Sequence, residues 1–252
     1  MSVIGIVSMK GGVGKTSTTA NLAAAMAARL GDGRVSVIDL DPQDGLHWHF
    51  GLAAADGMCA LSRRGGALTA ALHATAFDLA CLPYGAADEP ARESFEALLA
   101  QQPDWLGRQI DAAGLSHNAV VLIDTPPGPS VYLRQVFDCA DLIIIVLLAD
   151  AASYATIPAM ESWLASMATQ GCAAPCVYLL NQVDASDALS RDVTDMLRAR
   201  LGERLAPVRI HRDESVGEAL AFQQPVLVYD PHGQASHDMS RLASWVIDVL
   251  NR

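Results

Sequence analysis

Positive charge is scarce in this sequence, and lysine is nearly absent. The 17 Lys and Arg residues are outnumbered by 28 Asp and Glu, so the formal net charge at pH 7 is −11. Only two of the cations are lysines, Lys10 and Lys15, and both lie in one short stretch near the N-terminus. DNA and anionic lipid both reward dense positive charge, so a folded protein this acidic is a poor general binder of either. We therefore expect no DNA binding and no direct insertion into a membrane.

Long hydrophobic runs and paired cysteines are also missing. The longest purely apolar run, residues 142–149, has eight residues, whereas a membrane helix needs about 20. No basic segment precedes the strand-like VIGIV at the N-terminus, so we expect no signal peptide. The five cysteines are odd in number and form no CxxC pair, which is typical of reduced thiols. These absences predict a cytoplasmic protein.

What the sequence does contain is an alternation of short apolar runs with amphipathic stretches of helical length. Several runs are near-continuous Val, Ile and Leu, a pattern typical of parallel strands buried on both faces. The expected strands are residues 3–7, 35–39, 79–82, 119–124, 142–148, 177–180, 207–211 and 226–229. The expected helices are residues 16–30, 153–170, 187–201, 214–223 and 236–250, and residues 53–66 are the most loop-like stretch. The alternation predicts an α/β fold with a doubly wound, mostly parallel sheet, formed by residues 1–252 as a single domain.

The stretch VIGIVSMKGGVGKTST, residues 3–18, is typical of a strand, a glycine-rich turn and the start of a helix. Such glycines let the backbone turn tightly and direct its N–H groups at phosphate oxygens, and the helix N-terminus adds a positive dipole. Lys15 is placed to reach the β- and γ-phosphates, Thr16 to bind Mg²⁺ and Ser17 to bond the α-phosphate. The residues expected to contact the nucleotide here are Lys10, Gly11, Gly12, Val13, Gly14, Lys15, Thr16 and Ser17.

This loop departs from the ordinary P-loop pattern G-x-x-x-x-G-K-[ST]. Met9 stands where the first glycine is expected, and Lys10 comes directly before the double glycine. KGGVGKT is the deviant Walker A signature, and on this motif the chain resembles the ParA/MinD family of P-loop ATPases. The resemblance implies slow hydrolysis of ATP to ADP and phosphate by an ATP-dependent homodimer. It also implies that Lys15 serves its own nucleotide, whereas Lys10 reaches the phosphates bound to the partner subunit.

Carboxylates follow two of the expected strands, in SVIDLDPQ and VVLIDTPPG. The carboxyl ends of parallel strands meet at one edge of a sheet, so we expect these residues beside the phosphate loop. The resemblance implies that Asp124 holds Mg²⁺ together with Thr16, and that Asp41 orients the attacking water. Asp39 is expected to have a structural role, and residues 125–128 to form the second switch segment. The alternative, in which these aspartates only cap helices or turns, stays open.

An asparagine and an arginine are the candidates for reading the base. Asn181 follows an expected strand in VYLLNQVD, and in the family that residue reads adenine. Asn181 and Asp184 also fit the N-x-x-D spacing that reads guanine in GTPases, but Gln182 replaces the usual lysine, which favours ATP. The resemblance further implies that residues 210–215, IHRDES, complete the base pocket through the backbone and Arg212.

Histidines and cysteines elsewhere gave weaker signals. His47 and His49 form an H-x-H without a paired third ligand, so we expect a partner-facing or surface role in preference to a metal site. Cys172 and Cys176 are expected to pack in the core. A relative that carries an iron–sulfur cluster needs two cysteines near the switch segments, and only Cys139 is plausible.

Three stretches resemble the cellulose-biosynthesis branch of the family, BcsQ (also called YhjQ). They are LACLPYG, IHRDESVGEALAFQQPVLVYDP and LASWVIDVL. The resemblance implies a cytosolic component of bacterial cellulose secretion, recruited to the inner membrane by the cellulose synthase complex or its accessory subunits. The C-terminal SRLASWVIDVLNR has one arginine at each end and no lysine, unlike a basic membrane-binding helix. The alternatives are a ParA-like partition ATPase for another cargo, a scaffold that keeps ATP as a structural ligand, and a small-molecule kinase with an unidentified acceptor pocket.

Overall fold

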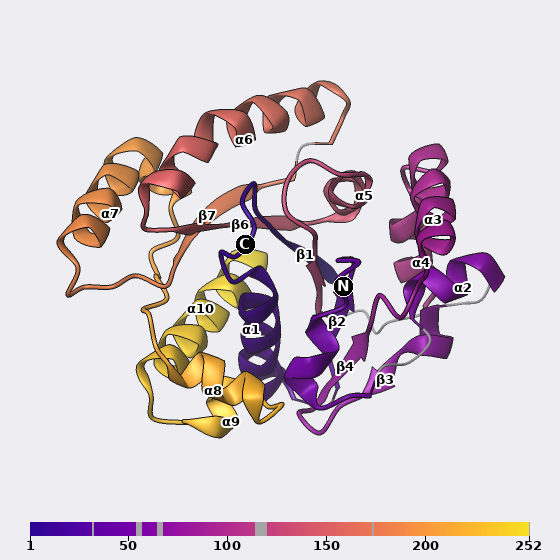
Figure 1. The fold of residues 1–252 in the computed structure, drawn as a ribbon, viewed down its shortest axis with the longest axis horizontal. Coiled ribbons are helices and arrows are strands. Elements are labelled where there is room, and N and C mark those ends of the chain that lie inside the picture. The colour runs from indigo at the N-terminus through magenta and orange to yellow at the C-terminus, as the bar shows by residue number, and fades with distance from the viewer. Residues whose placement is uncertain (32, 54–56, 65–67, 114–119, 173, 252) are drawn as a thin grey trace.

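A seven-stranded sheet forms the centre of the protein (Figure 1). The computed structural model describes the whole chain except residues 32, 54–56, 65–67, 114–119, 173 and 252. The strand order is β3-β4-β2-β5-β1-β6-β7, and all pairs are parallel except β3 with β4. The strands are β1 (Ser2–Val7), β2 (Val35–Asp39), β3 (His73–Ala74), β4 (Leu79–Leu82), β5 (Val120–Asp124), β6 (Leu142–Leu148) and β7 (Cys176–Asn181). The prediction of a doubly wound, mostly parallel α/β sheet is confirmed.

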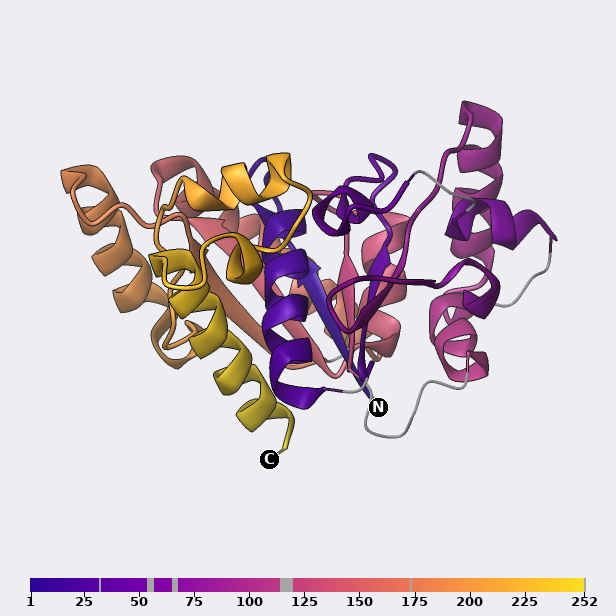
Figure 2. The same ribbon diagram turned by 90° about the horizontal axis from the view of Figure 1, so that it is seen from below.

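Helices cover both faces of the sheet (Figure 1). One face carries α1 (Lys15–Leu30) and α10 (Gln234–Leu250), with α8 (Ser215–Ala221) and α9 (Val226–Tyr229) beside them. The other carries α5 (Val131–Cys139), α6 (Ala151–Thr169) and α7 (Ala188–Leu201), and beyond them α2 (Met58–Arg64), α3 (Glu89–Gln101) and α4 (Trp105–Ala112). Figure 2 shows α8 near one end of the strands and both termini near the opposite end.

The central strand β1 contributes to two separate hydrophobic layers. Ile4 and Ile6 pack with residues of α1 and α10, whereas Val3 and Val7 pack with residues of α5 and α6. This division follows from the alternation of side chains along a strand. Gly5 lies where α5 comes close, since a Cβ there would collide with Val136. The absence of a side chain at this position therefore lets α5 pack directly on the sheet.

Most of the expected elements are present at nearly the expected bounds. The six strands expected between residues 3 and 180 are all found, although residue 119 lies outside the described residues. The five expected helices correspond to α1, α6, α7, α8 and α10. Sequence analysis missed α3, α4, α5 and the two-residue strand β3. Of the loop-like residues 53–66, Met58–Arg64 forms α2, so that expectation was wrong there, and residues 54–56, 65 and 66 lie outside the described residues.

Two expected strands were wrong. Residues 226–229 form helix α9, which begins directly after Pro225. Residues 207–211 form no strand: the Ile210 N–H donates to Leu180 O of β7 at 2.9 Å, and the isolated bridges nearby join Tyr178 with Leu205 and Val183 with His211. Pro207 has no N–H to donate, so a regular ladder cannot continue along this segment. Within the described part of the chain, no helix combines the length and apolar composition needed to cross a membrane.

The helices that the sequence analysis missed are joined by one buried side chain, Gln135 of α5. Its Nε2 donates to Leu99 O at 2.9 Å and to Gln102 O at 2.7 Å, and its Oε1 accepts from Leu106 N–H at 2.9 Å. It is 1% exposed, so water cannot replace these bonds. This amide therefore connects the end of α3 and the start of α4 to α5.

We expect Gln135→Leu to lower the free energy of unfolding by about 2–4 kcal/mol, because three hydrogen bonds to backbone groups are lost in the interior and, within the described chain, only Gln102 O keeps a bond, from the Trp105 N–H. Urea denaturation measures the change. The matched control is Gln101→Leu, at an exposed position of α3, which should change the stability by less than about 0.5 kcal/mol. Equal stability of the two variants would contradict this account of how α3, α4 and α5 are joined.

Candidate nucleotide site

The glycine-rich loop joins β1 to α1 and has a backbone that only glycine adopts easily. Gly12 and Gly14 have φ angles of 73° and 84°, in the left-handed region. A Cβ on Gly14 would also collide with the side-chain amide of Asn181. That amide donates to Val13 O at 2.8 Å, so β7 fixes the far side of the loop. A side chain at position 14 would therefore displace the Asn181 amide that holds the loop.

Lys15 is the first residue of α1 and its side chain is buried. Burial lowers the pKa of Lys15 from its usual value, while the charges of Asp124 and Asp41 act in the opposite direction. An ammonium held between two carboxylates at a helix N-terminus is suited to meet the phosphates of a nucleotide. The structure therefore brings Lys15 together with both carboxylates that the sequence analysis singled out.

Asp124 is fully buried at the end of β5 and is bonded to two threonines of α1. Thr16 Oγ1 donates to its Oδ2 at 2.6 Å, and Thr19 Oγ1 lies 3.3 Å from its Oδ1. Burial raises the pKa of Asp124 to about 6, against the lowering effects of the Thr16 bond and the Lys15 charge. A hydroxyl and a carboxylate oxygen in contact form a donor set that suits Mg²⁺. Sequence analysis missed Thr19, because a threonine inside a helix gives no signal of its own.

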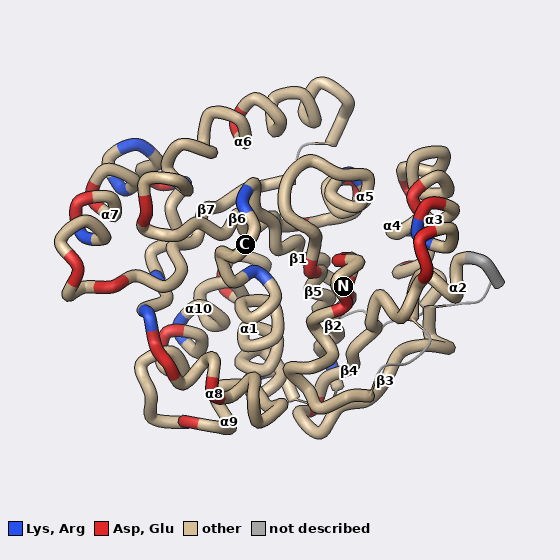
Figure 3. Tube along the Cα trace, in the orientation of Figure 1, with Lys and Arg blue, Asp and Glu red and all other residues tan. Residues whose placement is uncertain are grey.

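Asp39 and Asp41 have different environments at the end of β2, where acidic segments gather (Figure 3). Asp39 is fully buried and accepts the backbone N–H groups of Asp41 at 2.8 Å and of Leu46 at 3.0 Å. Burial, followed by the nearby charge of Asp124, holds the pKa of Asp39 well above its usual value. Asp41 is partly exposed, and among the described residues its carboxylate accepts only the N–H of Gln43. Asp39 therefore shapes the loop, whereas Asp41 is free to contact a ligand.

The segment after β5 is tied to the phosphate loop. Thr125 Oγ1 donates to Ile6 O at 2.9 Å, and the Gly128 N–H donates to Ser8 O at 2.8 Å. Residues 125–128 thus follow any displacement at the end of β1. This contact is what a switch segment beside the phosphates requires.

A pocket of approximately 570 Å³ adjoins the loop and lies where a base would follow the phosphates. Asn181 and Arg212, the two residues expected to bind the base, both line it, together with Gly14 and Ser17 of the phosphate loop. Asp184 is absent from the described lining and instead accepts hydrogen bonds from Ser186. The guanine-reading arrangement therefore has no support in the geometry.

Thr18 provides a test of whether the pocket suits a polar ligand. It is fully buried, lines the pocket, and its Oγ1 has no hydrogen-bond partner within the described chain. Buried hydroxyls nearly always have a partner, so this atom fits a ligand that supplies one. A nucleotide seated on Gly14 and Lys15 meets that requirement, and the residues present fit ATP with Mg²⁺.

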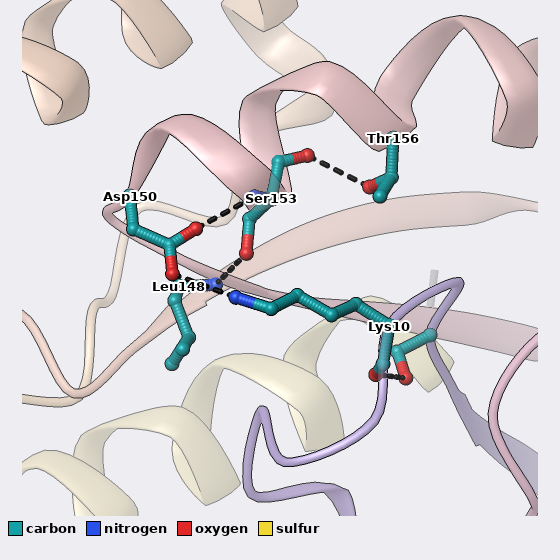
Figure 4. A network of polar contacts seen from close by, with 6 residues as sticks. Lys10, Leu148, Asp150, Ser153 and Thr156 are labelled. Carbon is teal, nitrogen blue, oxygen red and sulfur yellow. Dashed lines mark hydrogen bonds and ion pairs between the residues drawn. The ribbon is translucent and has the colours of Figure 1, made fainter.

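Lys10 lies apart from the base pocket in the single chain. Its Nζ is 2.8 Å from Oδ2 of Asp150, the residue that caps the N-terminus of α6 (Figure 4). The other oxygen of Asp150 accepts the Ser153 N–H at 2.6 Å. Burial of Asp150 is outweighed by these bonds, so its pKa is lower than usual. Sequence analysis missed Asp150, which is 140 positions away from Lys10.

The remaining histidine and cysteine expectations are partly corrected. His47 and His49 are 2% and 3% exposed in the 3₁₀ helix Leu46–Phe50, so a surface role is wrong, and burial lowers the pKa of His49 to about 4. No group of His, Cys, Asp and Glu suited to a metal occurs among the described residues. Cys172 and Cys176 pack against the core as expected. Cys139 lines a pocket with Met1, at the start of β1, which is far from the switch segments.

We expect Asp124→Asn to stabilise the nucleotide-free protein at pH 7.5, by about 1–2 kcal/mol, while removing the effect of Mg²⁺. A carboxyl whose folded pKa is raised to about 6 gives stability that is present below its unfolded value and is lost as pH rises through 6. At pH 7.5 the buried charged carboxylate therefore lowers the free energy of unfolding, and Asn removes this effect. Thermal unfolding with ATP, with and without Mg²⁺, measures both effects. Exposed Asp192→Asn is the control, and a variant that is less stable or still responds to Mg²⁺ would contradict the assignment.

The backbone is similar to solved structures of nucleotide-binding proteins. An ATP complex of a McdA variant from Cyanothece matches with a TM-score of 0.81 at 17% identity, over 98% of this chain and 96% of that chain. MinD complexed with Mg-ADP from Pyrococcus horikoshii matches with a TM-score of 0.74 at 22% identity, over 97% of this chain and 95% of that chain. At such identities the likeness shows the fold alone, which is that of the MinD and ParA P-loop NTPases.

Two functional groups of relatives are about equally similar in sequence. The cellulose biosynthesis protein BcsQ of Salmonella typhimurium is 29% identical over 255 residues, covering 98% of this chain and 94% of the relative. The chromosome-partitioning ATPase Soj of Thermus thermophilus is 28% identical over 259 residues, covering 97% of this chain and 94% of the relative. The family model described as "Cellulose biosynthesis protein BcsQ" matches residues 1–247. This match covers nearly the whole chain, including the phosphate loop, both carboxylate strands and the base pocket. The chain therefore belongs to the BcsQ family, within the ParA/MinD-like ATPases.

Proposed function

We propose that residues 1–252 act as a single ATPase domain, an ATP-dependent dimerising switch in bacterial cellulose biosynthesis and secretion. The observation that carries the proposal is the convergence of three parts at Gly14 and Lys15. They are the phosphate loop, the bonded Thr16–Asp124 pair and the base pocket. Each part suits a different portion of ATP–Mg²⁺, and the three are contiguous. Membership of the BcsQ family supports the cellulose role.

The residues divide the chemistry between them. Lys15 and the loop N–H groups hold the phosphates, and Thr16 with Asp124 is placed to hold Mg²⁺, which when bound neutralises charge on the β- and γ-phosphates. Asp41 accepts only a local backbone bond, so its carboxylate can orient a water molecule for attack. Asn181 and Arg212 line the pocket proposed for adenine.

Lys10 is proposed to act in trans, on the nucleotide of a second subunit. In the single chain its ammonium is neutralised by Asp150, and the side chain is 33% exposed. Exposed ion pairs contribute only about 0–1 kcal/mol, so this pair is weak enough to exchange for a phosphate. A cation delivered across the interface stabilises charge that develops during phosphoryl transfer. Dimerisation and hydrolysis are then linked through one side chain.

A partition role remains the second candidate, because Soj is about as similar to this chain as BcsQ is. The net charge of −11 argues against the dense phosphate contacts that DNA binding needs. A scaffold that keeps ATP as a structural ligand is the third, and turnover distinguishes it from a switch. We propose that the protein is cytoplasmic and reaches the inner membrane through a protein partner of the cellulose synthase complex.

We expect the 26.6 kDa chain to double its mass in solution only with ATP–Mg²⁺, and to release phosphate. Asp41→Ala should accumulate the dimer with little turnover, since water positioning matters mainly in the transition state. Lys10→Ala should bind ATP yet stay monomeric. Light scattering beside a phosphate-release assay measures all three.

Asp150→Asn tests whether Lys10 leaves Asp150 to contact a phosphate of the second subunit. Asn still caps α6 but no longer holds the ammonium, so this variant should dimerise at lower protein concentration than the wild type. Loss of ATP binding in Lys15→Ala serves as the negative control. Normal dimerisation and turnover by Lys10→Ala would exclude a role in trans, and ATP binding without any turnover by the wild type would favour the scaffold.

The cellulose role is tested in the organism that carries the gene. Deletion should abolish cellulose export and leave chromosome and plasmid segregation unchanged, and the Lys15→Ala allele should not restore export. A segregation defect, together with ATP-dependent retention of duplex DNA at about 100 mM salt, would assign the protein to the partition branch.

A further inference from the structure

A second polar pocket lies behind the nucleotide site, between α7, α10 and the segment that follows α7. Its volume is approximately 420 Å³. Three arginines from these three parts line it, Arg198, Arg209 and Arg241. His211 lines both this pocket and the nucleotide pocket, so one residue separates them. Basic segments of α7 and α10 lie on the same side of the molecule (Figure 3).

Two of these arginines have no counter-charge in the part of the chain that the structure describes. Within the described residues, Arg209 and Arg241 form neither an ion pair nor a side-chain hydrogen bond, and Arg198 is paired only with exposed Asp195, at 3.1 Å. By contrast, Arg200 and Arg204 are both paired with Glu161, at 3.3 and 2.9 Å. A chain with 28 acidic residues could readily supply such partners here.

The buried carboxylate that contacts His211 is already hydrogen-bonded. Asp238 of α10 is 1% exposed, and its Oδ2 lies 2.8 Å from His211 Nδ1 and accepts the His211 N–H at 2.9 Å. Its Oδ1 accepts from Gln234. Asp238 therefore holds the wall between the two pockets in place and leaves the guanidinium groups of the second pocket without an anion.

We propose that this pocket binds a small phosphate-bearing molecule through Arg209 and Arg241, with Arg198 at its margin. Guanidinium groups that face one pocket repel one another, and an anion in the pocket relieves that repulsion. The planar guanidinium matches phosphate oxygens in pairs, which a lysine ammonium does not. Leu180, Ala206 and Val208 add an apolar wall for the rest of the molecule. The volume is that of a small-molecule site and not of a surface for duplex DNA.

The experiment uses inorganic pyrophosphate as the probe, with the full chain loaded with one equivalent of ADP–Mg²⁺ to occupy the first site. Phenylglyoxal modifies accessible arginines, and mass spectrometry reads each position. Pyrophosphate should slow the modification of Arg209 and Arg241 and leave that of Arg134 unchanged. Arg134 is an exposed arginine of α5 that also has no ion pair or side-chain hydrogen bond within the described chain. This readout is specific to position and needs no turnover, so it distinguishes the second pocket from the nucleotide site even if the proposed ATPase function fails.

Calorimetry with variants provides the second measurement. The double variant Arg209→Ala/Arg241→Ala should lose pyrophosphate affinity by about tenfold or more, and Arg134→Ala should lose none. Both positions are exposed, so unchanged thermal unfolding shows that the double variant is folded. Equal protection of all three arginines, or equal affinity of the double variant and the wild type, would overturn the proposal. Protection of Arg209 and Arg241 by duplex DNA but not by pyrophosphate would instead assign the pocket to nucleic acid.

Discussion

The site depends on keeping a carboxylate, Asp124, inside the protein at the end of a central strand. Water cannot reach it, and an isolated buried carboxylate is strongly disfavoured. Two hydroxyls and one ammonium, all on the first two turns of α1, stabilise the charged form of Asp124. These interactions fix how α1 begins, because Lys15, Thr16 and Thr19 must all face β5. This stabilisation is only partial, since the pKa of Asp124 is still raised to about 6. A divalent cation beside Thr16 would stabilise the charged carboxylate further.

A second buried carboxylate shows how the same constraint shapes the neighbouring strand. Asp39 of β2 is paired in register with Asp124, so two carboxylates share one edge of the sheet. Asp39 faces the backbone amides of Asp41 and Leu46, which turn the chain away from the sheet. The turn places Asp41 partly in solvent beside the phosphate loop. One aspartate therefore builds the loop, and the other is left available for chemistry.

The sequence was informative where the physical cause is local and uninformative where it is distant. Buried parallel strands, and the strand, glycine-rich turn and helix at residues 3–18, follow from local runs of Val, Ile, Leu and Gly, so those structural predictions are confirmed. Residues 226–229, VLVY, form a short apolar run typical of a buried strand, yet the Val226 N–H donates to Asn21 Oδ1 of α1 at 2.7 Å, and that contact spans 205 positions. Helices α3 to α5 depend likewise on Gln135, and the partner of Lys10 on Asp150. No local pattern contains such contacts, and Thr18 and Thr19 were missed because they look like ordinary helix residues.

The proposed transfer of Lys10 from Asp150 to a phosphate gives a physical reason why this position is lysine in a chain that otherwise uses arginine. A residue that must leave one anion and reach another is better as a single ammonium on a flexible stem than as a guanidinium. Arginine would bond both oxygens of Asp150 and resist release. One of those oxygens is needed elsewhere, because it caps α6 through Ser153, whose Oγ in turn accepts the Leu148 N–H at the end of β6. Departure of Lys10 therefore changes the charge at a helix start that is bonded to the sheet. A partner that binds α6 more tightly after that change needs a difference of only about 1–3 kcal/mol to sense the bound nucleotide.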